Sequence, residues 1–225
     1  MSVSSRSGAG IHGRTLPWLT LALSGSMALL YLVLGPAPPA WVYDRDAIVA
    51  GEWWRLVSGH WVHSDLPHLG WNLGATLLLG GLLELRDRRA WLIALAAGTG
   101  AVDAALWFGL PGLTRYCGLS GVLNAVLLPL LFALGRTVPA RLLALSGALS
   151  LGKILTELAA GQALFTQAAW PSLPEAHLAG WLAGLLPVVP MYWRCGCRIG
   201  YRSGRRVRLF RFRCRQECRL PRLQP

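Results

Sequence analysis

The chain has 225 residues, of which 54% are hydrophobic and only 14% are charged, with a formal net charge of +12. Soluble domains usually carry about 25% charged residues, so the composition rules out a disordered chain and argues against a soluble globular domain. The 26 glycines and 11 tryptophans favour a membrane protein, because glycine lets helices approach closely and tryptophan prefers the membrane interfaces.

Six apolar stretches predict an all-α, polytopic bundle of six membrane-spanning helices. The first, residues 16–35, is long enough to cross a bilayer and is followed by a polar, tryptophan-rich loop over residues 36–66. The other spans are expected at about residues 67–85, 90–110, 118–134, 138–159 and 174–193. We therefore predict one membrane domain, residues 16–193, between an N-terminal segment, 1–15, and a tail, 194–225.

The positive charge is concentrated in this tail. Residues 194–225 hold eleven arginines and one acidic residue, which gives +10 of the net +12. A polybasic run directly after an apolar segment is typical of a cytoplasmic anchor near anionic lipid, so we expect lipid and no nucleic acid as its partner. Four of the five cysteines lie here. Their loose spacing and the surrounding arginines argue against a zinc site, and we expect no metal or other cofactor.

The arginines also predict the orientation. One set of helix flanks contains Arg6, Arg14, Arg86, Arg88, Arg89, Arg136, Arg141 and the tail, whereas the opposite set contains only Arg45, Arg55 and Arg115. Cytoplasmic flanks carry the excess of basic residues. Both termini are therefore predicted to be cytoplasmic.

In this orientation the second, fourth and sixth helices all begin on the outer side. Each carries reactive side chains near that end: His68 and Asn72, then Ser120, then His177. The fourth helix is short, because 17 residues span only about 25 Å against a hydrocarbon core of about 30 Å. Ser120 is therefore expected below the outer surface, beside a recess that holds water.

These residues allow more than one interpretation. Ser120 is flanked by Gly118 and Gly121, which free its surroundings of bulk, but a serine in an apolar helix often only bonds a carbonyl one turn back. His177 lies on about the same face as Gly180 and Gly184, whose spacing lets two helices approach closely.

An intramembrane histidine is costly and usually functional, although His177 could also be a bonded bundle residue. His68 and Asn72, four residues apart, could stabilise an oxyanion or form a polar clamp between helices. Zinc binding by the histidines lacks a recognisable ligand spacing.

Together the motifs resemble the rhomboid intramembrane serine proteases. They are, in order, Trp54-Arg55, His63, His68-x-x-x-Asn72, Gly118-x-Ser120-Gly121 and His177-x-x-Gly180-x-x-x-Gly184. The compact six-helix length, with Gly-Leu-Ser-Gly-Val-Leu and His-Leu-Ala-Gly, is most similar to the bacterial rhombosortase branch.

The resemblance implies a role for each matching residue. Ser120 would be the nucleophile and His177 the general base of a Ser–His dyad without an acid. His68, Asn72 and the Ser120 amide would stabilise the oxyanion. Structural roles are implied for Trp54, Arg55, His63, Gly118, Gly121, Gly180 and Gly184, and Glu84 matches the Gly-Gly-x-x-Glu that ends the second helix.

The resemblance also implies a substrate and a location. The substrates would be membrane-anchored proteins with a single or C-terminal transmembrane helix, cleaved near the periplasmic face of a bacterial inner membrane. The rhombosortase branch implies a tail of small residues, often Gly-Gly, then a helix, then basic residues. The alternatives are a non-catalytic relative that binds membrane helices, and a transporter that uses His177, Asp103 and Lys153 as a proton path.

Four residues depart from the family or need separate explanation. Asn124 occupies a position four residues after the nucleophile where the family commonly has an aromatic residue or a histidine that packs on the catalytic imidazole. Lys153 and Glu157 are four residues apart on the fifth helix and are expected to pair with each other. Asp103 is expected either to face the wet recess or to bond within the bundle.

Overall fold

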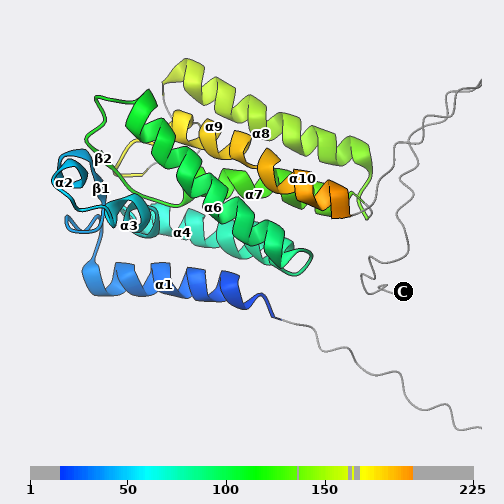
Figure 1. Cartoon of the computed structure of the whole chain (residues 1–225), viewed down its shortest axis with the longest axis horizontal. Coiled ribbons are helices and arrows are strands. Elements are labelled where there is room, and N and C mark those ends of the chain that lie inside the picture. Colours follow the sequence, from blue (N-terminus) through cyan, green and yellow to red (C-terminus); the bar gives the residue numbers. More distant parts are fainter. Residues whose placement is uncertain (1–15, 136, 162–163, 165–167, 195–225) are drawn as a thin grey trace, which may run out of the picture.

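The computed structural model describes residues 16–135, 137–161, 164 and 168–194, and this part of the chain is almost entirely helical (Figure 1). Its helices are α1 (Trp18–Leu34), α2 (Arg45–Val49), α3 (Arg55–Trp61), α4 (Leu66–Ala75), α5 (Gly81–Glu84), α6 (Arg88–Ala104), α7 (Ser120–Leu134), α8 (Ala140–Ala160), α9 (Pro174–Ala183) and α10 (Leu185–Arg194). Two π-helical turns, η1 (Thr76–Gly80) and η2 (Ala105–Gly109), join α4 to α5 and extend α6. The segment 1–15, the cysteines at 195, 197, 214 and 218 and the rest of the arginine tail lie outside the described residues.

Helix covers each range in which a span is predicted. Two helical rods, Arg88–Gly109 and Ala140–Ala160, are both long and apolar enough to cross a membrane, and α1 and α7 are shorter apolar helices. The all-α prediction is correct for the bundle, whereas the number of crossings stays a prediction.

Much of the bundle's outer surface is apolar. Leu32 of α1 and Phe108 of η2 are 82% and 81% exposed, and large aliphatic side chains on α8 and α10 are exposed as well. Such extensive apolar exposure is rare on a monomer surrounded by water. It fits a surface that faces lipid.

Helix α7 forms the centre of the bundle and packs against α4, α6, α8, α9 and α10. Small residues make these approaches possible. A Cβ on Gly98 of α6 would lie 3.0 Å from the side chains of Val122 and Ala125, and one on Gly184 would lie 2.8 Å from the Ala125 carbonyl oxygen. Helix α1 lies along one side of the bundle (Figure 1) and packs on α4, η1 and α5.

Residues 36–66, predicted as a polar loop, contain regular structure. Strand β1 (Tyr43–Asp44) pairs antiparallel with β2 (Arg115–Tyr116), and helices α2 and α3 follow β1. Arg45 donates to the carbonyl oxygens of residues 106, 107, 110 and 113. These bonds fix the segment to the chain just before α7.

Candidate active site

Ser120 is the first residue of α7, and the preceding turn requires glycine. Gly118 has φ +108°, a backbone conformation that side chains disfavour, and its N–H donates to the Gly59 carbonyl at 2.9 Å. The Tyr116 hydroxyl donates to the Gly118 carbonyl at 2.8 Å. The turn is thus held from two sides, and the Ser120 amide lies in the first turn of a helix, where N–H groups have no partner within the helix.

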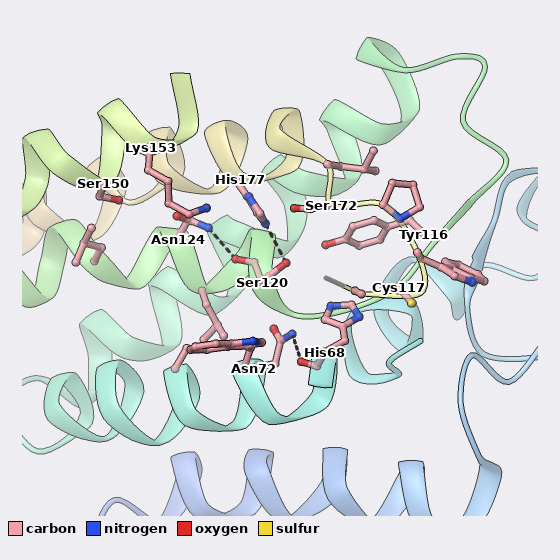
Figure 2. Close-up of a pocket in the computed structure, with 18 of the residues that line it drawn as sticks. His68, Asn72, Tyr116, Cys117, Ser120, Asn124, Ser150, Lys153, Ser172 and His177 are labelled. Carbon is pink, nitrogen blue, oxygen red and sulfur yellow. Dashed lines mark hydrogen bonds between the residues drawn. The ribbon is translucent and has the colours of Figure 1, made fainter. Parts of the chain in front are cut away.

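His177 lies in the first turns of α9, and its ring faces Ser120 (Figure 2). The His177 Nε2 to Ser120 Oγ distance is 3.0 Å, and His177 is only 7% exposed. The close packing of α9 on α7 produces this contact. A Cβ on Gly180 would collide with the Gly121 carbonyl oxygen, so glycine is required there.

Helix α4 brings His68 and Asn72 to the same side of the site (Figure 2). The His68 Nε2 lies directly against Gly118, so a side chain at 118 would displace the imidazole. Its Nδ1 is 3.1 Å from the Ser64 hydroxyl. Asn72 is buried and donates one amide hydrogen to the His68 carbonyl at 2.9 Å. The structure therefore brings all four predicted side chains to one place.

A cavity of about 330 Å³ lies over these residues. Its lining comes from α4, η1, α7, α8, α9 and the segments before α7 and α9, and it is mainly apolar. His68, Asn72, Ser120 and His177 all contribute to the lining. A cavity with an apolar wall and a few convergent polar groups is the usual form of a substrate site.

The segment before α4 supports His68. Asp65 caps α4 by accepting from the His68 N–H at 2.7 Å, and its second oxygen accepts from Ala169 N–H at 2.6 Å. Burial opposes ionisation of Asp65, but these bonds and the one from Ser64 outweigh it, so the pKa of Asp65 lies below its ordinary value. Asp65 thereby connects α4 to the segment that leads into α9, a role that the sequence did not reveal.

His63 lies under His68 in an edge-to-face contact, with ring centroids 5.0 Å apart. It is fully buried, and burial, assisted by the neighbouring His68, lowers the pKa of His63 to about 3. At neutral pH His63 is therefore an uncharged packing partner of His68.

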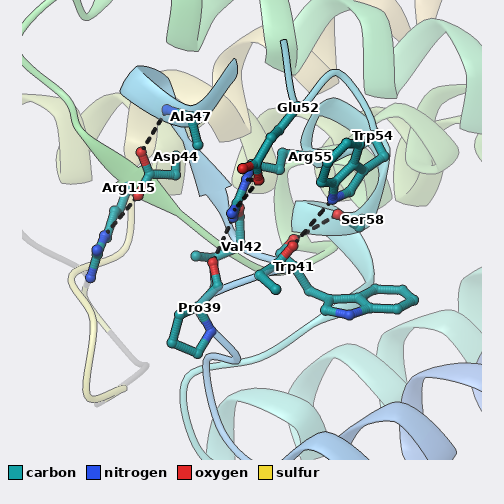
Figure 3. Close-up of polar contacts among 11 residues, drawn as sticks. Pro39, Trp41, Val42, Asp44, Ala47, Glu52, Trp54, Arg55, Ser58 and Arg115 are labelled. Carbon is teal, nitrogen blue, oxygen red and sulfur yellow. Dashed lines mark hydrogen bonds and ion pairs between the residues drawn. The ribbon is translucent and has the colours of Figure 1, made fainter. Parts of the chain in front are cut away.

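Trp54 and Arg55, at the start of α3, hold together the loop that precedes α4 (Figure 3). The buried Arg55 guanidinium donates to the carbonyl oxygens of Pro39 and Val42 at 2.6 and 2.9 Å and pairs with Glu52 at 2.6 Å. The Trp54 indole donates to the Ala40 carbonyl at 3.2 Å. Both side chains therefore support the loop and do not line the cavity.

Asn124 does not replace the expected aromatic residue as a partner of the imidazole. Its amide donates to the Ser120 carbonyl at 2.9 Å, within its own helix. Asp103, whose surroundings the sequence left open, lies 3.1 Å from His60 Nε2 and so bonds within the bundle.

Glu84 accepts from the Leu19 and Thr20 N–H groups at 3.0 and 2.8 Å, which fixes the start of α1 to the end of α5. Among the described residues, no three His, Cys, Asp or Glu side chains gather as a metal site would require.

The expected pair of Lys153 and Glu157 is confirmed, with 2.7 Å between Nζ and Oε2. Sequence reasoning missed a second neighbour of this carboxylate, His177, whose Nδ1 is 3.7 Å away. The only sequence signal was an acidic residue in the last turn of an apolar helix, which does not by itself indicate its partner.

The arrangement has the parts that acyl transfer needs. A hydroxyl contacts a histidine at hydrogen-bond distance, and amide and imidazole groups lie beside the hydroxyl at the start of a helix.

Comparison with known proteins gives one match. The family model described as Rhomboid domain matches residues 50–194, well over half of the chain and including every site residue named above. The curated proteins contain no match to the chain.

Proposed function

The chain belongs to the rhomboid family of intramembrane serine proteases, and we propose that it cleaves membrane-anchored proteins with Ser120 as nucleophile and His177 as general base. The observation that carries this proposal is the 3.0 Å contact between Ser120 Oγ and His177 Nε2 at the wall of the cavity. A non-catalytic relative would not need this contact.

In the first step, Ser120 Oγ attacks the scissile carbonyl while His177 Nε2 accepts the hydroxyl proton. The imidazolium then gives this proton to the leaving amide nitrogen, and the C–N bond breaks to leave an acyl-enzyme. Water then attacks the acyl carbonyl and gives a proton to the same nitrogen, the bond between the acyl carbon and Oγ breaks to release the acid, and Nε2 returns the proton to Ser120 Oγ. The histidine is unchanged after the cycle, so no third protein group has to supply or remove a proton.

The negative charge on the tetrahedral intermediate needs donors. The Ser120 N–H at the start of α7 is one, since helix N-termini favour anions. His68 presents Nε2 on the side of Gly118. Because the Ser64 hydroxyl donates its one hydrogen to Asp65 Oδ2 at 2.7 Å, it can only accept from His68 Nδ1–H, so Nε2 supplies a second donor when the ring is an imidazolium. Asn72 keeps a second amide hydrogen beyond the one given to the His68 carbonyl.

The resemblance to the rhombosortase branch also suggests which substrate tails the enzyme prefers. We infer a tail with small residues, often Gly-Gly, followed by a helix and basic residues. Glycine disfavours helix, so such a tail unwinds more readily and exposes its carbonyl. A reporter with a Gly-Gly tail should be cleaved faster than a matched Leu-Leu tail, whereas equal rates would contradict this preference.

The site is proposed to open toward the periplasm of a bacterial inner membrane, with both termini cytoplasmic. The distribution of arginines over the helix flanks supports this orientation. The tail beyond residue 194 would contact anionic lipid through its arginines.

A fluorophosphonate probe tests the assignment of the nucleophile. Purified wild-type protein in detergent should be labelled on Ser120, as identified by peptide mass analysis, and Ser120→Ala should not be labelled. The buried Cys117 is three residues away, so Cys117→Ala is the matched control and should still react. Labelling of Ser120→Ala to the wild-type extent would refute the proposal.

A further inference from the structure

We propose that Glu157 of α8 is a positioning residue for His177, so that a carboxylate orients the imidazole of this protease. The inference rests on the proposed function and adds to it, since the family resemblance implies a dyad without an acid. Helix α8 lies over the site, and Lys153, one turn before Glu157, borders the cavity (Figure 2).

The Glu157 carboxylate, the His177 imidazole and the Ser120 hydroxyl lie in a row, with the imidazole between the other two. Glu157 Oε2 is 3.7 Å from His177 Nδ1, and His177 Nε2 is 3.0 Å from Ser120 Oγ. Since the two nitrogens lie on different sides of the ring, the carboxylate and the hydroxyl contact different ends of it. This order of acid, imidazole and hydroxyl is the one that orients the base in soluble serine proteases.

His177 Nδ1 needs such a partner. It is buried and makes no hydrogen bond with any residue that the structure describes. A buried polar atom without a partner costs roughly 1–3 kcal/mol. An approach of less than about 1 Å would bring the carboxylate into hydrogen-bond range, so a small adjustment of either side chain satisfies the nitrogen.

The ion pair with Lys153 does not by itself explain why Glu157 is buried. On α8 the buried residues are Ile154 and Glu157, and the Glu157 side chain is fully buried whereas that of Lys153 is 36% exposed. A surface pair would leave both groups accessible at less cost. The carboxylate instead points inward, toward the α9 histidine.

Two bonds fix the carboxylate in this place. Lys153 Nζ donates to Oε2 at 2.7 Å, and the Leu164 N–H donates to Oε1 at 2.9 Å. Lys153 offsets the negative charge, so Glu157 can stay ionised in an apolar surrounding. The acceptor is thus held before the reaction begins, which is what orienting a base requires.

The positioning role of Glu157 follows from which nitrogen of His177 carries the proton at each step. An acceptor at Nδ1 favours the tautomer with its proton there, which leaves Nε2 able to accept the Ser120 proton. When His177 becomes an imidazolium, its Nδ1–H donates to Glu157, which remains ionised throughout. Asn124, at the position of the expected ring-packing residue, bonds the Ser120 carbonyl instead, so this task falls to Glu157.

The test compares Glu157→Gln with Glu157→Asp in proteoliposomes that contain a cleavable tail reporter. Glutamine keeps the acceptor for Leu164 but removes the charge. We expect kcat to fall by about 10- to 10³-fold, below the ~10⁴ known for a soluble triad that loses its acid, while KM changes by less than about twofold. Aspartate keeps the charge and should restore part of kcat.

Glu175→Gln is the matched control, because it makes the same substitution on the His177 helix two residues before His177. It should keep the wild-type kcat, and Glu157→Gln should keep the wild-type Tm. A wild-type kcat in Glu157→Gln would overturn the proposal. So would equal losses of kcat and Tm in the Gln and Asp variants, because these would indicate a structural role only.

A second measurement does not depend on any variant. In a structure of the wild-type enzyme phosphonylated on Ser120, the Nδ1 to Oε2 distance should shorten to about 3 Å, and a distance of 3.7 Å or more would overturn the proposal. Ser120→Ala separates the two claims: cleavage by it would refute the proposed function. An inert Ser120→Ala beside a fully active Glu157→Gln would refute only the role of Glu157.

Discussion

At the scale of single residues, Gly180 is the position with least room. We predict that Gly180→Ala pushes α9 away from the Gly121 carbonyl, at a cost of about 1–3 kcal/mol for overpacking. The displacement would also move His177 from Ser120, and a misplacement of about 1 Å can cost about 10²-fold in rate. Thermal unfolding and reporter cleavage measure the two effects.

Gly100→Ala of α6 is the control for this prediction. A Cβ there would have nothing within 4 Å, and alanine favours helix by about 1 kcal/mol. Gly100→Ala should therefore unfold at the wild-type temperature or above it. Equal behaviour of the two alanine variants would contradict the packing of α9 on α7.

Asp65 makes a prediction about pH. Its pKa is lowered in the folded protein, so its contribution to stability is present above the unfolded-state value of about 3.9 and is lost as the pH falls below it. Asp65→Asn should lower Tm at pH 7, and the difference from wild type should shrink near pH 3. The exposed Asp46 provides a control, since Asp46→Asn should change Tm little at either pH. A difference for Asp65→Asn that is the same at both pH values would contradict the charge-dependent role.

The residues of the site could be predicted from the sequence because the spacings in Ser120-Gly121 and His177-x-x-Gly180 are local. The structure places Ser120 and His177 in contact, while their catalytic roles stay proposals. The contact between Glu157 and His177 could not be predicted. Helical spacing reveals Lys153, four residues away, but the approach of His177 depends on how α8 packs on α9.

At the scale of elements, Glu84 joins α5 to α1. It accepts the N–H groups of Leu19 and Thr20 at the start of α1, of which the second is buried, and an orphaned buried donor costs roughly 1–3 kcal/mol. Glu84→Ala should lower Tm and speed hydrogen exchange at Leu19 and Thr20, whereas Glu175→Ala should do neither. Unchanged exchange at both amides in Glu84→Ala would show that this cap is dispensable.

Hydropathy predicted the long helices to within a few residues, because each is a continuous apolar stretch. It did not predict α2, α3 or the pairing of β1 with β2. These elements depend on contacts with distant parts of the chain, such as the bonds from Arg45 to carbonyls more than 60 residues away. Local composition carries no signal for such contacts.

At the scale of the whole molecule, the orientation in the membrane can be tested directly. Reporters fused after Leu85 or Gly135 should be cytoplasmic, and one inserted within residues 160–172 should be periplasmic. The reason is the excess of arginine on one set of flanks. Alkaline phosphatase activity, seen only outside the cytoplasm, measures the location. A cytoplasmic 160–172 segment would put His177 at the opposite side of the membrane from the one proposed.

The central claim is that one hydroxyl and one imidazole carry out the cleavage. The most direct measurement is cleavage of a membrane-anchored Gly-Gly tail reporter by wild-type, Ser120→Ala, His177→Ala and doubly substituted protein at matched membrane levels. All three variants should be inert, and the double variant no worse than either single one, because a nucleophile and its base act as a unit. Cleavage by membranes that contain only Ser120→Ala protein would contradict the account, and the nucleophile would then have to be sought elsewhere, first at Cys117.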